Sequence, residues 1–377
     1  MAVLTEEQSL LRDAAKSWTQ EKSPVSAFRK VRDSKAPLGY DPAAFAEMAQ
    51  MGWTGVIISE EYGGADFGWL SLGLVLEETG RTLTASPILA CAAAASAISL
   101  GGSAAQKQAW LPQIAAGELV ASLAMDEGAR HAPERTALAA AKAGGGYALS
   151  GEKSFVLEGM AAGLFVVAAR TSGKPGETAG ITLFLVPADA KGLTRKALKL
   201  VDSRVAANLA FDKVEVGADA VLGEADKGWE LLEKTLDRAR AGLAAEMLGA
   251  AAQAFETTLD YLKTRVQFGQ VIGAFQALQH RAAKMFTDLE LSRSCVEAAL
   301  AAIDAGSPQV PELVSLAKAK VGDTLHLVSN EMVQMHGGIG MTDAHDAGLY
   351  LKRARAAEAA FGNQAYHRDR YARLHGY

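Results

Sequence analysis

Two glycine-bearing segments in the last third of the chain combine residue types that can hold an anionic, aromatic ligand. The first, RVQFGQVIGAFQ, occupies positions 265–276. Its Arg265 can bind a phosphate through paired N–H donors, and its Phe268 offers a face for stacking. The second, QMHGGIG, occupies positions 334–340, and its glycines let backbone approach a ligand closely. Taken alone, each segment fits a turn between helices equally well.

Other chemistries are not supported. The seven histidines show no i, i+4 pair of the kind that binds a metal on one helix face, and no G-x-S-x-G or phosphate-binding P-loop is present. The two cysteines, Cys91 and Cys295, provide neither a disulfide framework nor metal-ligand spacing. The sequence therefore predicts no metal site and a reducing compartment.

The composition narrows the class of protein. The chain has 377 residues, 49% of them hydrophobic and 21% charged, with a formal net charge of −5. This balance predicts a folded protein with room for two or three domains, and the absence of a basic surplus argues against nucleic acid as a partner. The longest apolar tract, residues 88–100, is too short to span a bilayer. We expect a cytoplasmic protein with no membrane insertion.

The elements that must position the two segments follow from hydrophobic periodicity. The first region contains helices with clear start signals: Thr5 and Gln8 at capping-box spacing, and Asp41 immediately before a proline. The second region changes to eight short strand-like runs separated by glycine, lysine and proline turns, which favours a small β-barrel or sandwich.

The third region returns to helical periodicity. Four long helices are predicted, at 229–262, 276–305, 310–335 and 347–373, which is typical of an antiparallel bundle. The predicted fold is a multi-domain α+β chain with an N-terminal helical domain (1–117), a middle β-barrel domain (118–222) and a C-terminal four-helix bundle (223–377).

With this order of regions, the two segments resemble motifs of the acyl-CoA dehydrogenase family. Residues 265–276 match R-x-x-F-G-x-x-[IL]-x-x-x-Q, and residues 334–340 match Q-x-x-G-G-x-G. Less specific matches are SEEYGGAD at 59–66 and LYLKRARA at 349–356. The resemblance covers nearly the whole chain, and the family fold has the same order of helical, β and four-helix regions.

The resemblance implies an FAD enzyme. In the family, the first motif reaches the adenine and pyrophosphate half of an FAD that is bound mainly by a neighbouring subunit. This assigns Arg265, Phe268 and Gln276 to cofactor binding, with Gln267 at a further contact position. The second motif, through Gln334 and Gly338, lines the diphosphate and ribityl path of the same cofactor.

The flavin-ring positions depart from the family pattern. Where the family has T-E-P-G-A-G-S-D this chain has MDEGARHA at 125–132, with Asp126 nearest the threonine. The family triplet W-I-T, which covers the flavin, becomes Phe155, Val156 and Leu157. Phe155 can still cover a ring, whereas Leu157 has no side-chain hydrogen bond to give.

The catalytic base of the family is also missing. Family members remove the α-proton of an acyl-CoA thioester with a glutamate while a hydride passes to the flavin. That glutamate stands before a glycine near the C-terminus, here Phe361, or before an arginine early in the long helix, here Ala239. Two other carboxylates, Glu246 and Glu358, are nearby in the sequence, and Glu246 is the candidate base we retain.

The expected activity is α,β-desaturation of an acyl-CoA thioester. The missing base resembles the subunit without glutamate in heterotetrameric enzymes for steroid or other bulky acyl-CoAs. The implied partners are an electron-transfer flavoprotein or similar acceptor and, in a homo- or heterotetramer, a glutamate-bearing homologue. Two alternatives remain: a non-catalytic scaffold subunit that supplies half an FAD site, and a flavin-dependent monooxygenase on the same fold.

Overall fold

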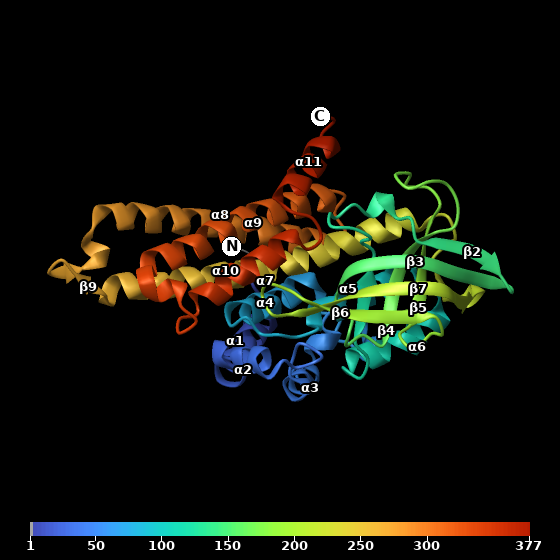
Figure 1. Ribbon diagram of the computed structural model, residues 1–377, viewed down its shortest axis with the longest axis horizontal. Helices are drawn as coiled ribbons and strands as arrows, with labels where there is room; N and C mark the ends of the chain where they lie inside the picture. Colours follow the sequence, from blue (N-terminus) through green and yellow to red (C-terminus); the bar gives the residue numbers. More distant parts are fainter. Residues whose placement is uncertain (1–2) are drawn as a thin grey trace. The chain divides into compact units, whose positions relative to one another are not determined.

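The computed structural model describes residues 3–377, and it begins with helices (Figure 1). The helices that precede the sheet are α1 (Glu6–Lys22), α2 (Val25–Ser34), α3 (Pro42–Gln50), α4 (Gly68–Arg81), α5 (Ile88–Gly101) and α6 (Ala104–Ala115). The predicted helix starts are confirmed. The Thr5 hydroxyl accepts from the Gln8 backbone amide in a reciprocal capping box, and the Asp41 carboxylate accepts from the amide of Ala43.

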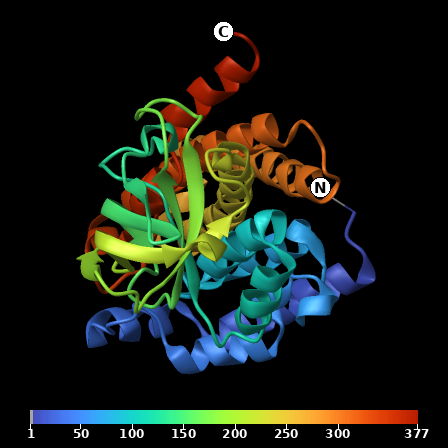
Figure 2. The same ribbon diagram turned by 90° about the vertical axis from the view of Figure 1, so that its right-hand side faces the viewer.

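Eight strands form one sheet in the middle region, as the strand count predicts. They are β1 (Ala121–Ala124), β2 (Ala139–Ala143), β3 (Gly146–Leu157), β4 (Leu164–Arg170), β5 (Ile181–Pro187), β6 (Leu193–Lys199), β7 (Val205–Gly217) and β8 (Val221–Leu222). Their order is β6-β7-β3-β2-β4-β5-β8, with β1 pairing parallel to β4. Figure 2 shows these green and yellow strands side by side.

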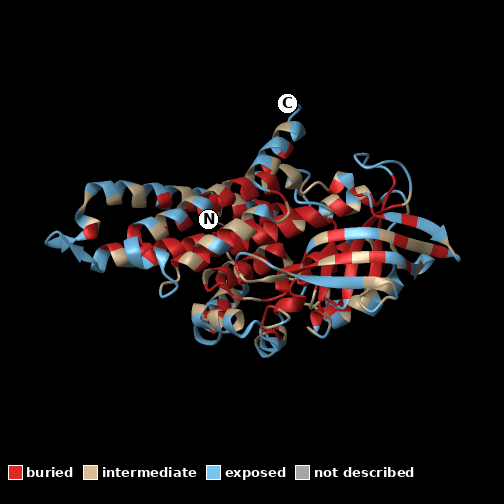
Figure 3. Cartoon of the chain, in the orientation of Figure 1, coloured by how far each residue is buried: buried red, intermediate tan, exposed pale blue. Residues whose placement is uncertain are grey.

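The sheet is open where a barrel was predicted. Among residues 3–377, β6 and β8 end the hydrogen-bonded path without pairing to each other. Two features account for this: β8 has only two residues, and β6 is largely exposed. The buried apolar residues are concentrated instead in β4 and β5, whose residues are almost all buried (Figure 3).

Helices return after the sheet: α7 (Gly228–Thr264), α8 (Gln276–Asp304), α9 (Val310–His336), α10 (Ala347–Ala359) and α11 (Gln364–Leu374). The first three match the prediction. The predicted helix over 347–373 is wrong, because it breaks between α10 and α11. Phe361 and Gly362 have φ angles of +55° and +100°, which no right-handed helix accommodates.

Contacts group the chain into two compact units. The helical unit comprises Met1–Lys30, Trp69–Thr84 and Arg240–Tyr377, and the sheet unit comprises Val31–Gly68 and Ala85–Ala239. The N-terminal region is divided because α4 is bonded to the later helices: the Trp69 amide donates to Asp304 at 2.6 Å. These units cut across the predicted domain bounds, which stay a prediction.

Inside the helical unit, α4 and α7 approach each other closely through two glycines. A Cβ added at Gly249 would lie 1.8 Å from the Glu77 carbonyl oxygen, and one at Gly80 would lie 2.0 Å from that of Glu246. Any side chain at either position would force the two backbones apart. Within the described residues, no helix is both long enough and apolar enough to cross a membrane.

Candidate functional site

The first predicted motif forms a hairpin between α7 and α8, at the end of both helices marked β9 in Figure 1. Its two strands, β9 (Val266–Gln267) and β10 (Gln270–Val271), pair antiparallel. Phe268 and Gly269 form the turn with φ angles of +54° and +80°, the combination that a tight two-residue hairpin requires. A left-handed phenylalanine is unusual, and this one is 90% exposed. The fold thus holds an aromatic ring out in solvent.

Arg265 lies at the base of this hairpin with an exposed side chain. Its backbone oxygen accepts from the Ile272 amide at 2.8 Å, which fixes the hairpin base. Its guanidinium forms no ion pair with any carboxylate among residues 3–377. An accessible guanidinium of this kind can bind both oxygens of a phosphate group.

The two predicted glutamines of this motif are exposed as well. Gln276 is the first residue of α8, whose first turn has no side-chain cap. An uncapped helix start carries a partial positive charge that favours an anion. Gln267 directs its amide to the Val266 carbonyl at 2.8 Å.

The second predicted motif ends α9 and contacts the same end of α7. His336 is buried, and its ring lies 4.3 Å from that of Tyr261, centroid to centroid. Tyr261 is in the last turn of α7, and its carbonyl accepts from the Arg265 amide at 2.8 Å. The structure therefore brings the two motifs together, although Gln276 and Gln334 are 58 positions apart in the sequence (334 − 276).

Gln334 and Gly338 are exposed beside this contact. A Cβ added at Gly338 would meet no atom within 4 Å. The packing of the protein therefore does not require glycine at position 338. The open space beside its backbone would allow a ligand to approach closely. The exposed Arg265 guanidinium, the uncapped start of α8 and the exposed Phe268 ring together fit an anionic, aromatic cofactor such as FAD.

The positions predicted to contact the flavin ring lie in the sheet unit. The segment after β1 is attached to β3, because the Asp126 carbonyl accepts from the Ser154 amide at 2.7 Å and the Met125 carbonyl accepts from the buried Lys153 ammonium at 3.0 Å. The Asp126 carboxylate contacts His131 Nδ1 at 2.9 and 3.0 Å through its two oxygens. Contacts to β3 and the Asp126–His131 contact thus hold this segment in place.

Phe155 stands out from β3 at an irregularity. The pairing of β3 with β7 shifts register between Lys153 and Val156, and Phe155 has a φ of +54° there. Its amide donates to Asn208 Oδ1 at 3.2 Å, and its side chain is 52% exposed. A bulge of this kind re-aims a side chain, which here leaves an aromatic face available to cover a planar ligand.

The break between α10 and α11 forms a tightly held turn around Phe361. The Phe361 carbonyl accepts from Arg240 Nε at 3.3 Å and lies 3.1 Å from His367 Nε2. Lys318, buried on α9, donates to the carbonyls of Ala357 (3.1 Å), Glu358 (3.3 Å) and Gly362 (3.1 Å).

This turn is surrounded by nitrogen donors. Burial lowers the pKa of Lys318 to about 7, with Glu358 opposing and Arg240 reinforcing the shift. Burial, with the nearby charge of Arg240, also lowers the pKa of His367, so its imidazole is neutral. Their hydrogen bonds to carbonyls fix the turn, and within the described part of the chain no carboxylate is bonded to Phe361.

Glu246, the retained candidate base, is engaged elsewhere. It is 8% exposed, and its carboxylate contacts Arg353 Nη1 at 3.0 Å on α10. The Glu246 carboxylate is thus paired with an arginine of the neighbouring helix α10. Glu358 contacts Arg355 at 2.9 Å and His326 at 3.2 Å.

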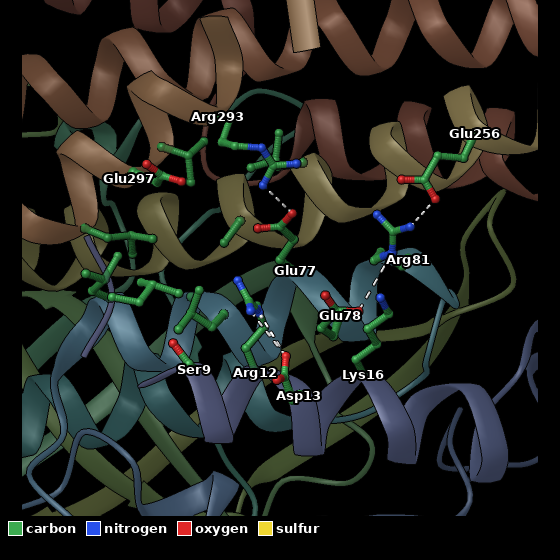
Figure 4. Close-up of a pocket in the computed structure, with 18 residues that line it drawn as sticks. Ser9, Arg12, Asp13, Lys16, Glu77, Glu78, Arg81, Glu256, Arg293 and Glu297 are labelled. Carbon is green, nitrogen blue, oxygen red and sulfur yellow. Dashed lines mark hydrogen bonds and ion pairs between the residues drawn. The ribbon is translucent and has the colours of Figure 1, made fainter. Parts of the chain in front are cut away.

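A cavity of about 540 Å³ in the helical unit lies apart from these residues (Figure 4). It is lined by side chains of α1, α4, α7 and α8, and its charges pair with one another. Arg293 contacts Glu77 at 2.6 Å, and Arg81 contacts Glu256. Burial raises the pKa of Glu78, against the effect of Arg81. None of the predicted cofactor residues lines this cavity.

Sequence reasoning missed three residues that organise the site. His131 and Lys153 fix the segment around Asp126, and Lys318 fixes the Phe361 turn. Lys318 had a visible signal, since it stands among apolar positions of a helical repeat with Val314, Val321 and Leu325, which are all buried. The Asp126–His131 contact spans a loop and has no periodic signal. No metal-binding cluster of His, Cys, Asp or Glu occurs in the described residues.

Comparison with known proteins gives one family across the chain. Three family profiles match: the acyl-CoA dehydrogenase N-terminal domain at residues 5–118, the middle domain at 126–214 and the C-terminal domain at 226–374. The short/branched chain specific acyl-CoA dehydrogenase of Bos taurus mitochondria is 31% identical over 363 residues, covering 94% of this chain and 82% of that protein.

Solved structures agree. Butyryl-CoA dehydrogenase from Megasphaera elsdenii superposes with a TM-score of 0.90 at 27% identity, covering 99% of both chains. A Tcur3481-Tcur3483 steroid ACAD variant gives a TM-score of 0.88 at 30% identity, covering 98% of this chain and 97% of that one. This chain belongs to the acyl-CoA dehydrogenase family of FAD-dependent oxidoreductases.

Proposed function

We propose that this chain serves in the α,β-desaturation of an acyl-CoA thioester as the subunit that lacks the catalytic glutamate. The observation that carries the proposal is the Phe361 turn. Phe361 and Ala239 occupy both family positions for the base, and the groups that hold the turn are Arg240, Lys318 and His367. An α-proton needs a base within about 3 Å, and among residues 3–377 the side chains bonded to the carbonyls of this turn are nitrogen donors.

The same turn keeps a role in binding the thioester. Three nitrogen donors fix its carbonyls and hold Phe361 in the left-handed region. A backbone amide held in this way can polarise a thioester carbonyl without reorganising. The chain is therefore expected to bind acyl-CoA with very poor turnover on its own.

The hairpin provides the cofactor half-site. Arg265 would bind the pyrophosphate of FAD, Phe268 would stack on its adenine, and Gln276 with the start of α8 would face its anionic part. Gln334, Gly338 and Gln267 would complete this half. When bound, FAD supplies the hydride acceptor; the residues named here only hold it.

Assembly with a second subunit would complete the site. Around the two motifs the helical unit exposes large apolar side chains, among them Phe268 (90%), Met341 (79%) and Val266 (54%). These side chains fit an interface with a second subunit. A glutamate-bearing homologue would supply the base, and an electron-transfer flavoprotein would reoxidise the flavin. The likeness to a steroid ACAD supports a steroid or other bulky acyl group.

A second candidate, a scaffold subunit that contributes only half an FAD site, is favoured by the ring-side positions. Asp126 stands nearest the family's threonine position and Leu157 has no side-chain donor, so ring-side affinity for FAD is expected to be weak. In that case the hairpin would serve only a flavin held by the neighbouring subunit.

Two measurements distinguish the proposed desaturase subunit from the scaffold subunit: the flavin content, and the acyl-CoA-dependent reduction of an artificial electron acceptor. The chain is purified alone and after co-expression with a glutamate-bearing homologue. Activity and FAD only in the co-expressed complex support the proposal. Rapid turnover by the chain alone contradicts it. The variant Asp126→Arg is chosen to block the ring-side position of this chain. If a complex that contains this variant keeps full activity, the chain is a scaffold subunit and binds no flavin ring of its own.

A further inference from the structure

The cavity in the helical unit (Figure 4) has an apolar end and a charged end, because the residues of α4 that line it change character along the helix. Leu70 and Leu74 come first, and Glu77, Glu78 and Arg81 follow at the spacing of one helix face. Leu74 lies one turn before Glu78, about 6 Å along the helix axis. A small molecule with an apolar part and a charged head group can therefore span the two ends.

Contacts between α4 and α8 fix the walls of the apolar end. A Cβ added at Gly73 would lie 2.4 Å from Leu300 Cδ1, so Leu300 packs directly on the backbone of α4. Val296, one turn earlier on α8, is buried and lines the same cavity. The Leu70 amide donates to the Asp304 carboxylate at 2.9 Å, which joins the start of α4 to the end of α8. The apolar end is thus built by the fold itself.

Two arginines at the charged end already have carboxylate partners. Arg293 contacts Glu77 at 2.6 Å, and Arg81 contacts Glu256. These ion pairs connect α4 to α8 and to α7 and hold the walls of the cavity together. Neither arginine is therefore left to attract a ligand by itself.

Two other charges at this end have no hydrogen-bonding partner for their side chains among residues 3–377. Glu78 is 8% exposed, and its ion pair with Arg81 Nε, at 3.8 Å, is too long for a hydrogen bond. Lys16, an exposed residue of α1, forms no ion pair within the described chain. Burial raises the pKa of Glu78, and the charges of Arg81 and Lys16 oppose this shift. A buried carboxylate without a donor is destabilising, so a ligand that donates hydrogen bonds to it would bind favourably.

We propose that this cavity is a binding site for a free α-amino acid with an apolar side chain. The ammonium of the ligand donates to Glu78, and its carboxylate binds the Lys16 ammonium. Its side chain lies beside Leu74 and Val296. The volume of about 540 Å³ falls within the range of roughly 300–1,000 Å³ that is usual for small-molecule sites.

This site is independent of the proposed desaturation. None of the residues predicted to bind FAD lines the cavity, and neither does Phe361. Binding should join α1 to α4 through the ligand, because Lys16 belongs to the first helix and Glu78 to the second. The amino acid is therefore expected to raise the thermal unfolding midpoint of the protein as well as to bind.

Calorimetric titration of the protein, in the assembly in which it purifies, tests the proposal with four probes. L-Leucine has both head groups and an apolar side chain. Isoamylamine lacks the carboxylate, isocaproate lacks the ammonium, and L-serine lacks the apolar side chain. L-Leucine should bind at least about tenfold more tightly than isoamylamine or isocaproate, since losing one charge-assisted hydrogen bond has an effect of roughly that size or more. L-Serine should also bind more weakly than L-leucine.

Two variants assign the two head groups to their partners. Glu78→Gln should weaken L-leucine binding by about tenfold or more and leave the weak binding of isocaproate unchanged. Lys16→Met should weaken L-leucine binding and leave that of isoamylamine unchanged. Lys22→Met, at an exposed position of the same helix α1 outside the cavity, is the matched control and should change neither affinity. Circular dichroism verifies that each variant is folded.

Three results would overturn the proposal: no binding of any probe to the wild-type protein, equal affinity of wild type and Glu78→Gln for L-leucine, or equal affinity of the wild type for L-leucine and isoamylamine. The third result would make the cavity a site for cations alone. If Glu78→Gln fails to fold, the comparison of the four probes on the wild-type protein decides the question. Flavin content and desaturation are measured separately, so failure of this site leaves the proposed function standing.

Discussion

The hairpin and the Phe361 turn use their polar groups in opposite ways. At the hairpin, the Arg265 guanidinium and the Phe268 ring face solvent, with no ion pair to Arg265 in the described chain. At the turn, Lys318, Arg240 and His367 are hydrogen-bonded to backbone carbonyls, and Arg240 also donates to the Tyr366 hydroxyl. The first region is therefore organised to receive a ligand, whereas the second is organised to hold its own shape. A binding site and a positioning scaffold can thus be told apart by whether their polar groups are already satisfied.

The largest expected effect comes from placing a base at the turn. Phe361→Glu should raise acyl-CoA desaturation by the homo-oligomer by about 10²–10⁴-fold, the usual contribution of general-base catalysis. Ala239→Glu tests the second family position in the same way. Single-turnover reduction of bound flavin by acyl-CoA measures the gain.

Phe361→Gln is the matched control for this gain, because it has the shape of glutamate without a base, and it should remain inactive. The comparison fails if the unmodified chain alone turns over rapidly and Glu246→Gln abolishes that activity. Glu246 would then be a relocated base despite its contact with Arg353.

At the hairpin, Arg265→Ala should weaken FAD binding by about 1.5–3 kcal/mol, the range for a hydrogen bond to a charged group. Arg265→Lys should recover only part of the loss, because an ammonium cannot bind two oxygens in a planar fork. Isothermal titration with FAD measures both changes. Arg373→Ala, an exposed arginine of α11, is the control and should have no effect. Equal affinity in wild type and Arg265→Ala would remove the hairpin from the cofactor site.

At the Phe361 turn, we expect substitutions to change the free energy of unfolding rather than FAD binding. Burial lowers the pKa of Lys318 from 10.5 to about 7. Between these values the unfolded chain binds more protons than the folded one, so this residue makes the unfolding free energy rise with pH, by at most about 1.4 kcal/mol per pH unit. Below pH 7 both states are protonated and the contribution to the slope vanishes.

Lys318→Met should remove this pH-dependent part and also leave three carbonyls without their donor, which lowers stability at every pH. Urea unfolding at several pH values compares the variant with wild type. Lys320→Met, on the same helix and paired with Asp288, is the control. If the Lys318→Met and wild-type curves stay parallel through the alkaline range, the buried amine does not titrate as described.

The sequence was most informative where structure is periodic or where a motif is contiguous. Helix starts at Thr5 and Asp41, eight strands and the α7–α8 junction follow from local patterns. The break at Phe361 was missed because apolar spacing continues through it, and only the φ angles at residues 361 and 362 end the helix. The Asp126–His131 pair was missed because tertiary contacts to β3, not spacing, bring the two side chains together.

The smallest expected effect concerns Phe268, where ligand binding and folding should respond in opposite directions. Its φ of +54° costs a non-glycine residue about 1–2 kcal/mol, and its exposed ring recovers little of that through an edge contact with Phe275 at 6.1 Å. Phe268→Gly relieves the strain but gives the unfolded chain more freedom, an offset of roughly 0.5–1 kcal/mol. The net result should be a gain in stability of about 1 kcal/mol or less, with FAD affinity reduced by about 0.5–1.5 kcal/mol as the stacking face is lost.

Phe268→Leu keeps the strain without the ring, so it should lose affinity and gain no stability. Denaturation midpoints and FAD titration of the three proteins test this; a glycine variant with unchanged FAD affinity would mean that the exposed ring serves no ligand, and the contrast between hairpin and turn would then rest on Arg265 alone.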